Sequence, residues 1–326
     1  MTTSVGSPPS IQTVRELSAR YSNWGRWGPD DQLGTLNFVT SEHVRAAASL
    51  IRSGRAISLQ IPLDEKGPQR GGGRFNPIHL MRSDGNDAGS DLFRQQRWGD
   101  RDPYFRGADD LIIFPLQCST QWDALSHVFF EGKMYNGFPA EFVTSGGAFK
   151  NDVSVARHRT VGRGVLLDMP RAKGVPYLEP GYAIGRTDLE HACEALNVRV
   201  GTGDFVLVRT GQIAQTRQRG DWGDYAGGDA PGLGFDSVGW VYDHEVAAVA
   251  TDTWGMEVRP NQTPDVYQPL HLIFIVHMGL WVGEIWDLDP LAEACAEEGR
   301  YEFFLSAQPL VVSRAVGSCL NPIAVL

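Results

Sequence analysis

Apolar and polar positions follow either a helical or a strand period over most of the chain. Helical spacing predicts helices at residues 41–54, 187–196 and 289–299. Ser41 and Thr187 are expected to cap the first two, because hydroxyl side chains accept hydrogen bonds from the first free backbone N–H groups. Alternation and short apolar runs predict strands at residues 56–61, 110–116, 163–168, within 200–211, 246–252 and 310–314.

Strands are mixed with helices throughout the chain, and no segment repeats. The pattern predicts one α/β domain over residues 13–326, preceded by a flexible tail at residues 1–12. Residues 64–110 are rich in Gly, Arg, Asp and Asn and have little periodicity. A loop of this length is either a functional lid or a partly mobile surface loop, and the pattern leaves both hypotheses open. In the lid hypothesis, residues 24–34 would close over the pocket together with parts of this loop.

Composition narrows the class of protein. A hydrophobic share of 42% and a charged share of 21% over 326 residues are typical of a soluble globular protein. The formal net charge of −10, without a basic tract, argues against nucleic acid or an anionic membrane as partner. No two of the four cysteines form a C-x-x-C pair and no leader segment is evident, so we expect a cytoplasmic protein without a thiolate zinc site.

The segment from Gln117 to His127 has the highest density of candidate functional side chains. Gln117, Gln121, Asp123 and His127 are separated by four, two and four residues, and they converge if a strand runs into a turn there. An acid in an apolar region is costly unless it is paired or binds a cation. The segment alone leaves two hypotheses open, a satisfied buried Asp–His pair and a metal site with a catalytic histidine.

Residues 117–137 resemble the signature of the cyclase family of metal-dependent hydrolases, which includes bacterial kynurenine formamidase and isatin hydrolase. The family pattern is His-x-Gly-Thr-His-x-Asp-x-x-x-His, and this chain matches it at Thr120, Asp123 and His127. Gln117 and Gln121 stand where the family has its first two histidines. The resemblance extends from residue 24 to residue 284 and implies a swivelling β/β/α sandwich.

A second motif lies downstream, where His271 is followed thirteen residues later by Glu284. The resemblance implies that Asp123, His271 and Glu284 bind a divalent metal, with Mn²⁺ or Zn²⁺ as the expected ion. Gln117 and Gln121 would either add carbonyl oxygens or hydrogen-bond the acids. His127 would carry protons between water and the leaving group.

The resemblance implies hydrolysis of an amide, a cyclic amide or a lactone in a small molecule by a homodimer or homotetramer. Trp24, Trp122 and Trp254 are expected to wall a flat pocket for an aromatic or cyclic substrate. Three alternatives remain: a binding protein that has lost catalysis, a cyclase or lyase that uses the same metal, and a Cys118–His127 dyad.

Overall fold

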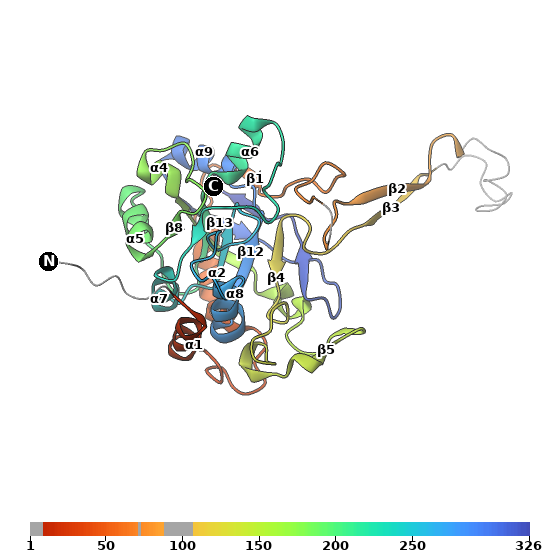
Figure 1. Ribbon diagram of the computed structural model, residues 1–326. Helices are drawn as coiled ribbons and strands as arrows, with labels where there is room; N and C mark the ends of the chain where they lie inside the picture. The colour runs from red at the N-terminus through yellow and green to blue at the C-terminus, as the bar shows by residue number, and fades with distance from the viewer. Residues whose placement is uncertain (1–8, 71–72, 88–106) are drawn as a thin grey trace.

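A mixed sheet forms the centre of the molecule in the computed structural model, which describes residues 9–70, 73–87 and 107–326 (Figure 1). Within these residues the sheet has nine strands, which lie side by side in the order β1 (Ala56–Ser58), β15 (Ile323–Val325), β13 (Glu302–Ser306), β7 (Val161–Asp168), β9 (Phe205–Arg209), β11 (Ala248–Thr251), β12 (Trp281–Glu284), β4 (Gln121–Asp123) and β14 (Gly317–Cys319). The α/β class predicted from the sequence is confirmed.

The centre of the sheet is parallel. Strands β7, β9, β11 and β12 run in one direction, and β11 is buried at every position, as expected for a strand covered on both faces. Strand β4 runs antiparallel to β12, so the carboxyl end of β12 meets the start of β4. This junction of parallel and antiparallel strands brings the two sequence motifs together.

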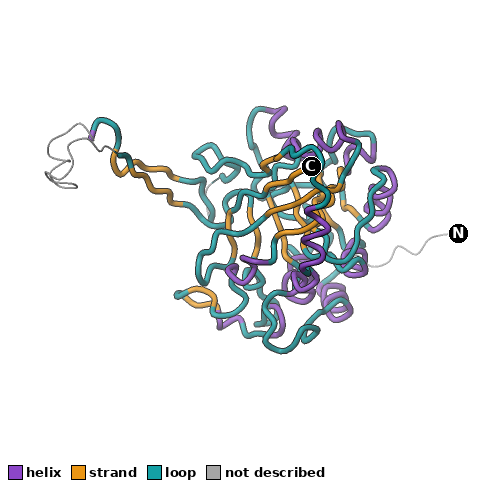
Figure 2. Tube along the Cα trace, turned by 180° about the vertical axis from the view of Figure 1, so that it is seen from behind, coloured by secondary structure: helices purple, strands orange, loops and turns teal. Residues whose placement is uncertain are grey.

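Helices lie around the outside of the central strands (Figure 2). They are α1 (Ile11–Arg20), α2 (Ser41–Ala48), α4 (Met169–Lys173), α5 (Arg186–Ala195), α6 (Gln212–Arg219), α7 (Ser237–Asp243), α8 (Pro269–His271) and α9 (Asp289–Glu298), with 3₁₀ turns η1 (Gly34–Phe38), η4 (Tyr135–Gly137), η5 (Ala140–Phe142) and η6 (Val153–His158) and a π-helix, η7 (Leu272–Met278). One buried apolar cluster extends from Val14 to Leu326. Among the described helices, none is both long and apolar enough to span a membrane.

Two predicted caps are wrong because a neighbouring residue supplies the cap, and one helix begins inside the predicted tail. The Thr40 side chain, and not that of Ser41, accepts a hydrogen bond from His43 N at the start of α2. At the start of α5 the Asp188 carboxylate accepts from Gly185 N at 2.9 Å, so Thr187 is not the cap. Helix α1 begins at Ile11, inside the predicted flexible tail, whose residues 1–8 lie outside the described residues.

Two predicted strands also differ from the structure. The segment at 310–314 is not a strand, and the last long strand is β13 at Glu302–Ser306. The apolar run at 110–116 contains β3 (Asp109–Ile113), but β3 pairs with β2 (Ile78–Ser83) and not with the central sheet. The shorter pairs are β5 (Val143–Thr144) with β6 (Gly147–Ala148), and β8 (Ala183–Ile184) with β10 (Gly232–Leu233).

Strands β2 and β3 form an arm that extends away from the body (Figures 1 and 2). Its apolar side chains are between 39% and 51% exposed: Ile78, Leu80, Met81, Leu111, Ile112 and Ile113. The predicted lid falls partly on residues 88–106, which lie outside the described residues, and the described strands of the segment point outward. An apolar surface of this kind is typical of a contact surface, and the predicted homo-oligomer would supply a partner for it.

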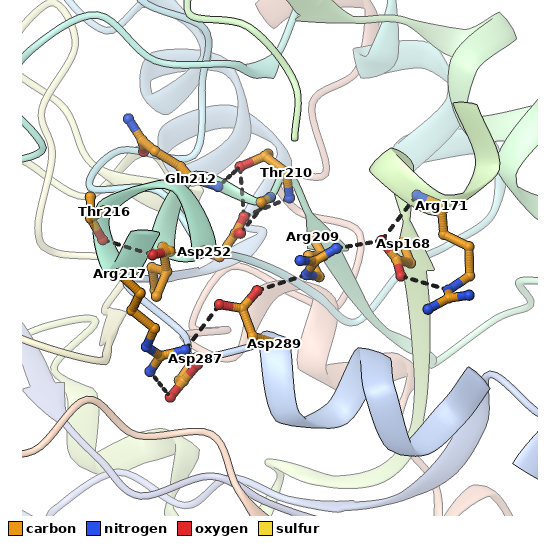
Figure 3. Close-up of polar contacts among 12 residues, drawn as sticks. Asp168, Arg171, Arg209, Thr210, Gln212, Thr216, Arg217, Asp252, Asp287 and Asp289 are labelled. Atoms are coloured by element: carbon orange, nitrogen blue, oxygen red, sulfur yellow. Dashed lines mark hydrogen bonds and ion pairs between the residues drawn. The ribbon is translucent and has the colours of Figure 1, made fainter. Parts of the chain in front are cut away.

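A network of ion pairs joins the carboxyl ends of β7 and β9 to α6 and α9 (Figure 3). Arg209 donates to Asp168 at 2.9 Å and to Asp289 at 2.8 Å, and Arg217 donates to Asp287 at 2.8 Å and to Asp289 at 2.9 Å. Burial alone would lower the pKa of Arg209, but the neighbouring acids raise it. The network therefore fixes the strand ends and leaves none of these acids free.

Asp252 lies beside this network, at the end of β11 (Figure 3). It accepts from Thr210 N at 2.7 Å, from Thr210 Oγ1 at 2.8 Å and from Gly211 N at 2.8 Å. From its place at a strand end, Asp252 could either orient a ligand or cap the loop. These contacts match the capping role.

We predict that Arg209→Met lowers the free energy of unfolding by about 3–5 kcal/mol, because it leaves Asp168 without its buried partner. Urea denaturation would measure the loss. Arg45→Met is the matched control, since the Arg45 side chain is 71% exposed in a weak pair with Glu42, and it should change stability by no more than about 0.5 kcal/mol. Equal denaturation midpoints for the two variants would contradict the assignment.

Candidate active site

Strands β4 and β12 place their polar side chains on one face of the sheet. Gln121 and Asp123 are two residues apart on β4, so both side chains point to the same side, and Gln121 pairs in register with Glu284 of β12. Trp122 points to the opposite face, where it is fully buried and packs edge-on against Trp286 with ring centroids 4.8 Å apart. The expectation that Trp122 walls a pocket is wrong, because successive strand residues face opposite sides.

Helix α8 and η7 carry His271 to the same place. Glu257, 1% exposed, accepts from the backbone N–H groups of Leu270 and His271, both at 3.1 Å, and its Oε1 lies 2.6 Å from His271 Nδ1. A carboxylate at Nδ1 favours the tautomer with the proton there, which turns Nε2 toward Glu284 Oε1 at 3.0 Å. Sequence reasoning missed Glu257, because nothing in its local pattern distinguishes it from an ordinary loop acid.

Asp123, His271 and Glu284 each offer one ligand atom, and these atoms all lie within 4.8 Å of one another. All three residues are buried, with exposed fractions of 1%, 3% and 3%. Gln121 Nε2 donates to Glu284 Oε2 at 3.0 Å and to Asp123 Oδ1 at 3.3 Å. The amide therefore bridges the two carboxylates from the side.

Two oxygens of this cluster are buried without a hydrogen-bond partner in the described part of the chain, Asp123 Oδ2 and Gln121 Oε1. A buried acceptor without a partner is costly, so each such group needs an explanation. Carboxylate and amide oxygens next to a carboxylate-oriented imidazole form a donor set that suits a divalent cation such as Mn²⁺ or Zn²⁺. The residues present fit the predicted metal.

The ionisation of the cluster follows from burial and mutual charge. Burial raises the pKa of Asp123, and the neighbouring Glu284 charge raises it further. Burial would lower the pKa of His271, but its hydrogen bonds to Glu257 and Glu284 raise it well above the ordinary value. Burial would raise the pKa of Glu284, but the hydrogen bond from His271 lowers it. The contacts with both acids therefore favour the charged form of His271, and a bound cation would compete with its proton.

His127 stands beside the cluster and not within it. Its Nε2 lies 3.8 Å from Asp123 Oδ1 and 3.5 Å from Arg74 Nη2, and its side chain is 21% exposed. The Arg74 guanidinium in turn lies over the Trp254 ring at 5.4 Å, and Trp254 Nε1 donates to Gln69 Oε1 at 3.3 Å. The structure therefore brings His127 and Trp254 to one side of the cluster, through an arginine that sequence reasoning missed because it lies in the aperiodic segment.

Gln117 lies on the same side of the sheet as the cluster. A Cβ on Gly317 would come within 2.5 Å of Gln117 Nε2, and Gly317 pairs with Asp123 in the sheet. Cross-strand partners share a face, so the Gln117 amide occupies the side of the sheet that carries Asp123. Its buried Nε2 has no partner among the described residues.

Trp24 is not brought to the cluster. Its Nε1 donates to Val276 O at 2.7 Å, and its ring stacks on His277 at 4.8 Å, in the second half of η7. Among the described contacts, none joins Trp24 to Asp123, His271 or Glu284. His277 packs against Trp24 and has a structural role.

Cys118 does not have the environment of a nucleophile. It is fully buried beside Cys319, and this neighbouring thiol together with burial raises its pKa. Attack requires a thiolate, which such an environment disfavours. The geometry therefore argues against the Cys118–His127 dyad.

Two surface hollows lie away from the cluster. One, of about 870 Å³, is lined by Arg163, Arg300 and Glu302 among others, and another, of about 680 Å³, lies beside the Arg209 network. Arg163 already pairs with Asp204 at 2.7 Å and with Glu302 at 2.5 Å. Neither hollow is a better candidate active site than the cluster, although both are large, because the charged side chains that line each hollow neutralise one another.

Comparison with known proteins identifies the class. The model of the "Putative cyclase" family matches residues 36–258, and the chain belongs to this family. A crystal structure described as a novel cyclase is 39% identical, with a TM-score of 0.83 over 95% of this chain and 99% of the other. No curated protein matches.

Isatin hydrolases share the fold at lower identity. Isatin hydrolase A from Labrenzia aggregata is 18% identical, with a TM-score of 0.56 over 85% of this chain and 94% of the other. Isatin hydrolase A from Ralstonia solanacearum is 17% identical, with a TM-score of 0.58 over 83% of this chain and 91% of the other. At these identities the likeness concerns the fold, and the α/β architecture expected from the resemblance is confirmed.

We predict that the purified protein binds about one equivalent of Mn²⁺ or Zn²⁺ and that Asp123→Ala abolishes this binding, because it removes a buried ligand. Elemental analysis and calorimetric titration would measure it. Asp110→Ala is the matched control, since Asp110 also faces a histidine, His79, at 2.8 Å but on the exposed arm. Full metal occupancy in Asp123→Ala would locate the metal elsewhere.

Gln121→Leu tests the bridging amide. The substitution keeps the size of the side chain but removes the N–H groups between the two carboxylates, so we expect metal affinity to fall about 10- to 100-fold. Gln308→Leu, at an exposed position, should leave affinity unchanged. If titration gives the same affinity for both variants, Gln121 has no part in the site.

Proposed function

We propose that this protein is a metal-dependent hydrolase that cleaves an amide, cyclic amide or lactone bond in a small aromatic or cyclic substrate. The observation that carries the proposal is the buried cluster of Asp123, His271 and Glu284, with unpartnered oxygens and a partly buried His127 beside it. Membership of the cyclase family and the fold shared with isatin hydrolases support it.

The ligands would come from three elements. Asp123 Oδ2, His271 Nε2 and a Glu284 oxygen would hold the cation, with Gln121 Oε1 as a further oxygen. A divalent cation at such a site supplies Lewis acidity, which lowers the pKa of water and polarises a carbonyl group. Glu257 holds the His271 ring in position, so it is a positioning residue.

His127 would move the proton. In hydrolysis, water adds to the carbonyl carbon and loses a proton, and the bond to nitrogen or oxygen then breaks as the leaving group gains one. His127 is near enough to Asp123 to face the reacting atoms, and it is not needed as a ligand. It would accept the proton from water and return it to the leaving group.

Trp254 would supply the flat surface against which the substrate ring lies. It is partly buried, it packs against the small apolar cluster of Ile61, Ile213, Tyr225 and Ile285, and it adjoins Arg74. An aromatic side chain at the accessible side of a metal cluster excludes water from one face of a ring and leaves the bond to be cleaved beside the ligands.

A second function is favoured by one observation. Gln121 already bridges Asp123 and Glu284 through its amide, which partly compensates the acids without a metal. A binding protein that has lost catalysis would require no more than this. The retained His127 favours the hydrolase, because a binding site has no need of a proton carrier.

His127→Asn distinguishes the two. In the hydrolase it should leave metal content and folding nearly intact and lower kcat by about two to four decades, the usual contribution of a positioned acid–base group. The assay would use N-formyl aromatic amines, isatin and aromatic lactones, with EDTA expected to abolish turnover. His79→Asn, on the exposed arm, is the control.

Three outcomes of this assay are informative. A His127→Asn enzyme with nearly wild-type kcat would refute the proton-transfer role. Absence of turnover by the metal-loaded wild type on every substrate would favour the binding protein. Turnover that survives EDTA would refute the metal mechanism.

A further inference from the structure

Arg74 is a partly buried cation without a carboxylate partner among the described residues. Arg74 Nη2 lies 3.5 Å from His127 Nε2, and the guanidinium lies 5.4 Å from the centroid of the Trp254 ring. The partly buried Arg163 and Arg209, by contrast, each pair with two acids. The Arg74 guanidinium, next to an indole ring and an imidazole, lacks a direct ion pair of this kind.

The acids of the cluster do not pair directly with Arg74, although its charge lowers the pKa of both Asp123 and Glu284. Asp123 Oδ1 accepts from Gln121, and Glu284 accepts from Gln121, from Met256 N at 3.1 Å and from His271. Neither carboxylate lies within ion-pair distance of Arg74 in the described part of the chain. Arg74 thus adds positive charge at the edge of the cluster while most of its N–H groups remain available to a ligand.

We propose that Arg74 binds a carboxylate carried by the substrate, on the ring that lies against Trp254, next to the bond that is cleaved. This rests on the proposed hydrolase function and narrows the substrate class to aromatic amides or lactones that bear an acid group. A planar guanidinium binds a carboxylate through two parallel hydrogen bonds, and an aromatic ring attached to that carboxylate can lie on the indole face.

Charge favours a carboxylate over a phosphate. Asp123, Glu284 and Glu257 already concentrate acidic groups at this place. A single guanidinium balances the one charge of a carboxylate, whereas a phosphate dianion would add an uncompensated charge beside these acids. Arg74 also contacts His127 and not the atoms that would ligate the metal, so it is suited to a group one position removed from the scissile carbonyl.

A matched pair of substrates tests the inference. 2-Formamidobenzoate carries the carboxylate, and 2-formamidobenzamide has the same shape without the charge. With the metal-loaded full chain, kcat/KM should favour the benzoate about 10- to 100-fold, the usual value of a charge-assisted hydrogen bond. Arg74→Gln should abolish most of this preference, and Arg74→Lys should retain part of it.

Arg70→Gln is the matched control, because Arg70 is exposed and only four residues away. It should keep the full preference. A preference that survives in Arg74→Gln, or that falls equally in Arg70→Gln, would overturn the inference, since the selectivity would then come from the metal or from the general field of the protein.

A binding measurement separates this inference from the proposed hydrolysis. Calorimetry with 2-aminobenzoate and 2-aminobenzamide needs no turnover, and the wild type should bind the acid at least about 10-fold more tightly, with the difference lost in Arg74→Gln. This result without turnover of the formamides would support the role of Arg74 and count against the hydrolase. Equal affinity of the wild type for both compounds, or no binding of either, would overturn the role of Arg74 whatever the activity.

Discussion

The structure depends on the compensation of acidic groups that the central sheet buries. The register of β4 and β12 sets Glu284 opposite Gln121 and Asp123 opposite Val282, so the two acids are diagonal neighbours and not a direct cross-strand pair. Directly opposed like charges would destabilise the pair of strands. With Gln121 between them, one amide donates to both carboxylates, and His271 with its partner Glu257 completes the cluster. Sheet register and electrostatics therefore support the same arrangement.

Sequence reasoning could predict what a local pattern encodes. The α/β class and the buried strands followed from periodicity, and the convergence of Asp123, His271 and Glu284, with His127 beside them, was implied by the family resemblance. Trp122 was misassigned because its neighbours in sequence are site residues, although the strand period turns it toward the core. The strand at 110–116 was misplaced because its apolar side chains are exposed on the arm, and apolarity alone does not report burial.

Glu257 and Arg74 show why the other residues of the site could not be predicted from the sequence. Glu257 acts on His271 through a contact across fourteen residues, and Arg74 reaches His127 across fifty-three. Neither separation corresponds to a helix or strand period, so only the folded chain brings these groups together. The predicted cap at Ser41 was wrong for a simpler reason. Thr40 and Ser41 both carry a hydroxyl group that can cap a helix, and the backbone geometry alone selects between them.

The two glutamines give the site its particular character. At the positions where the resemblance predicts imidazoles, this chain has carboxamides, which carry no titrating charge and donate N–H groups as well as accepting. At Gln121 the N–H groups are turned to the acids and the oxygen is left buried without a partner, so the residue compensates charge on one side and offers one oxygen on the other. A site built in this way has less ligand capacity than one with two more histidines, and the positive charge of Arg74 at its edge offsets part of the same acidic excess. Histidines at both positions would add ligands for a second cation, whereas we propose one cation for the amide-bridged acids and an anionic substrate for the guanidinium.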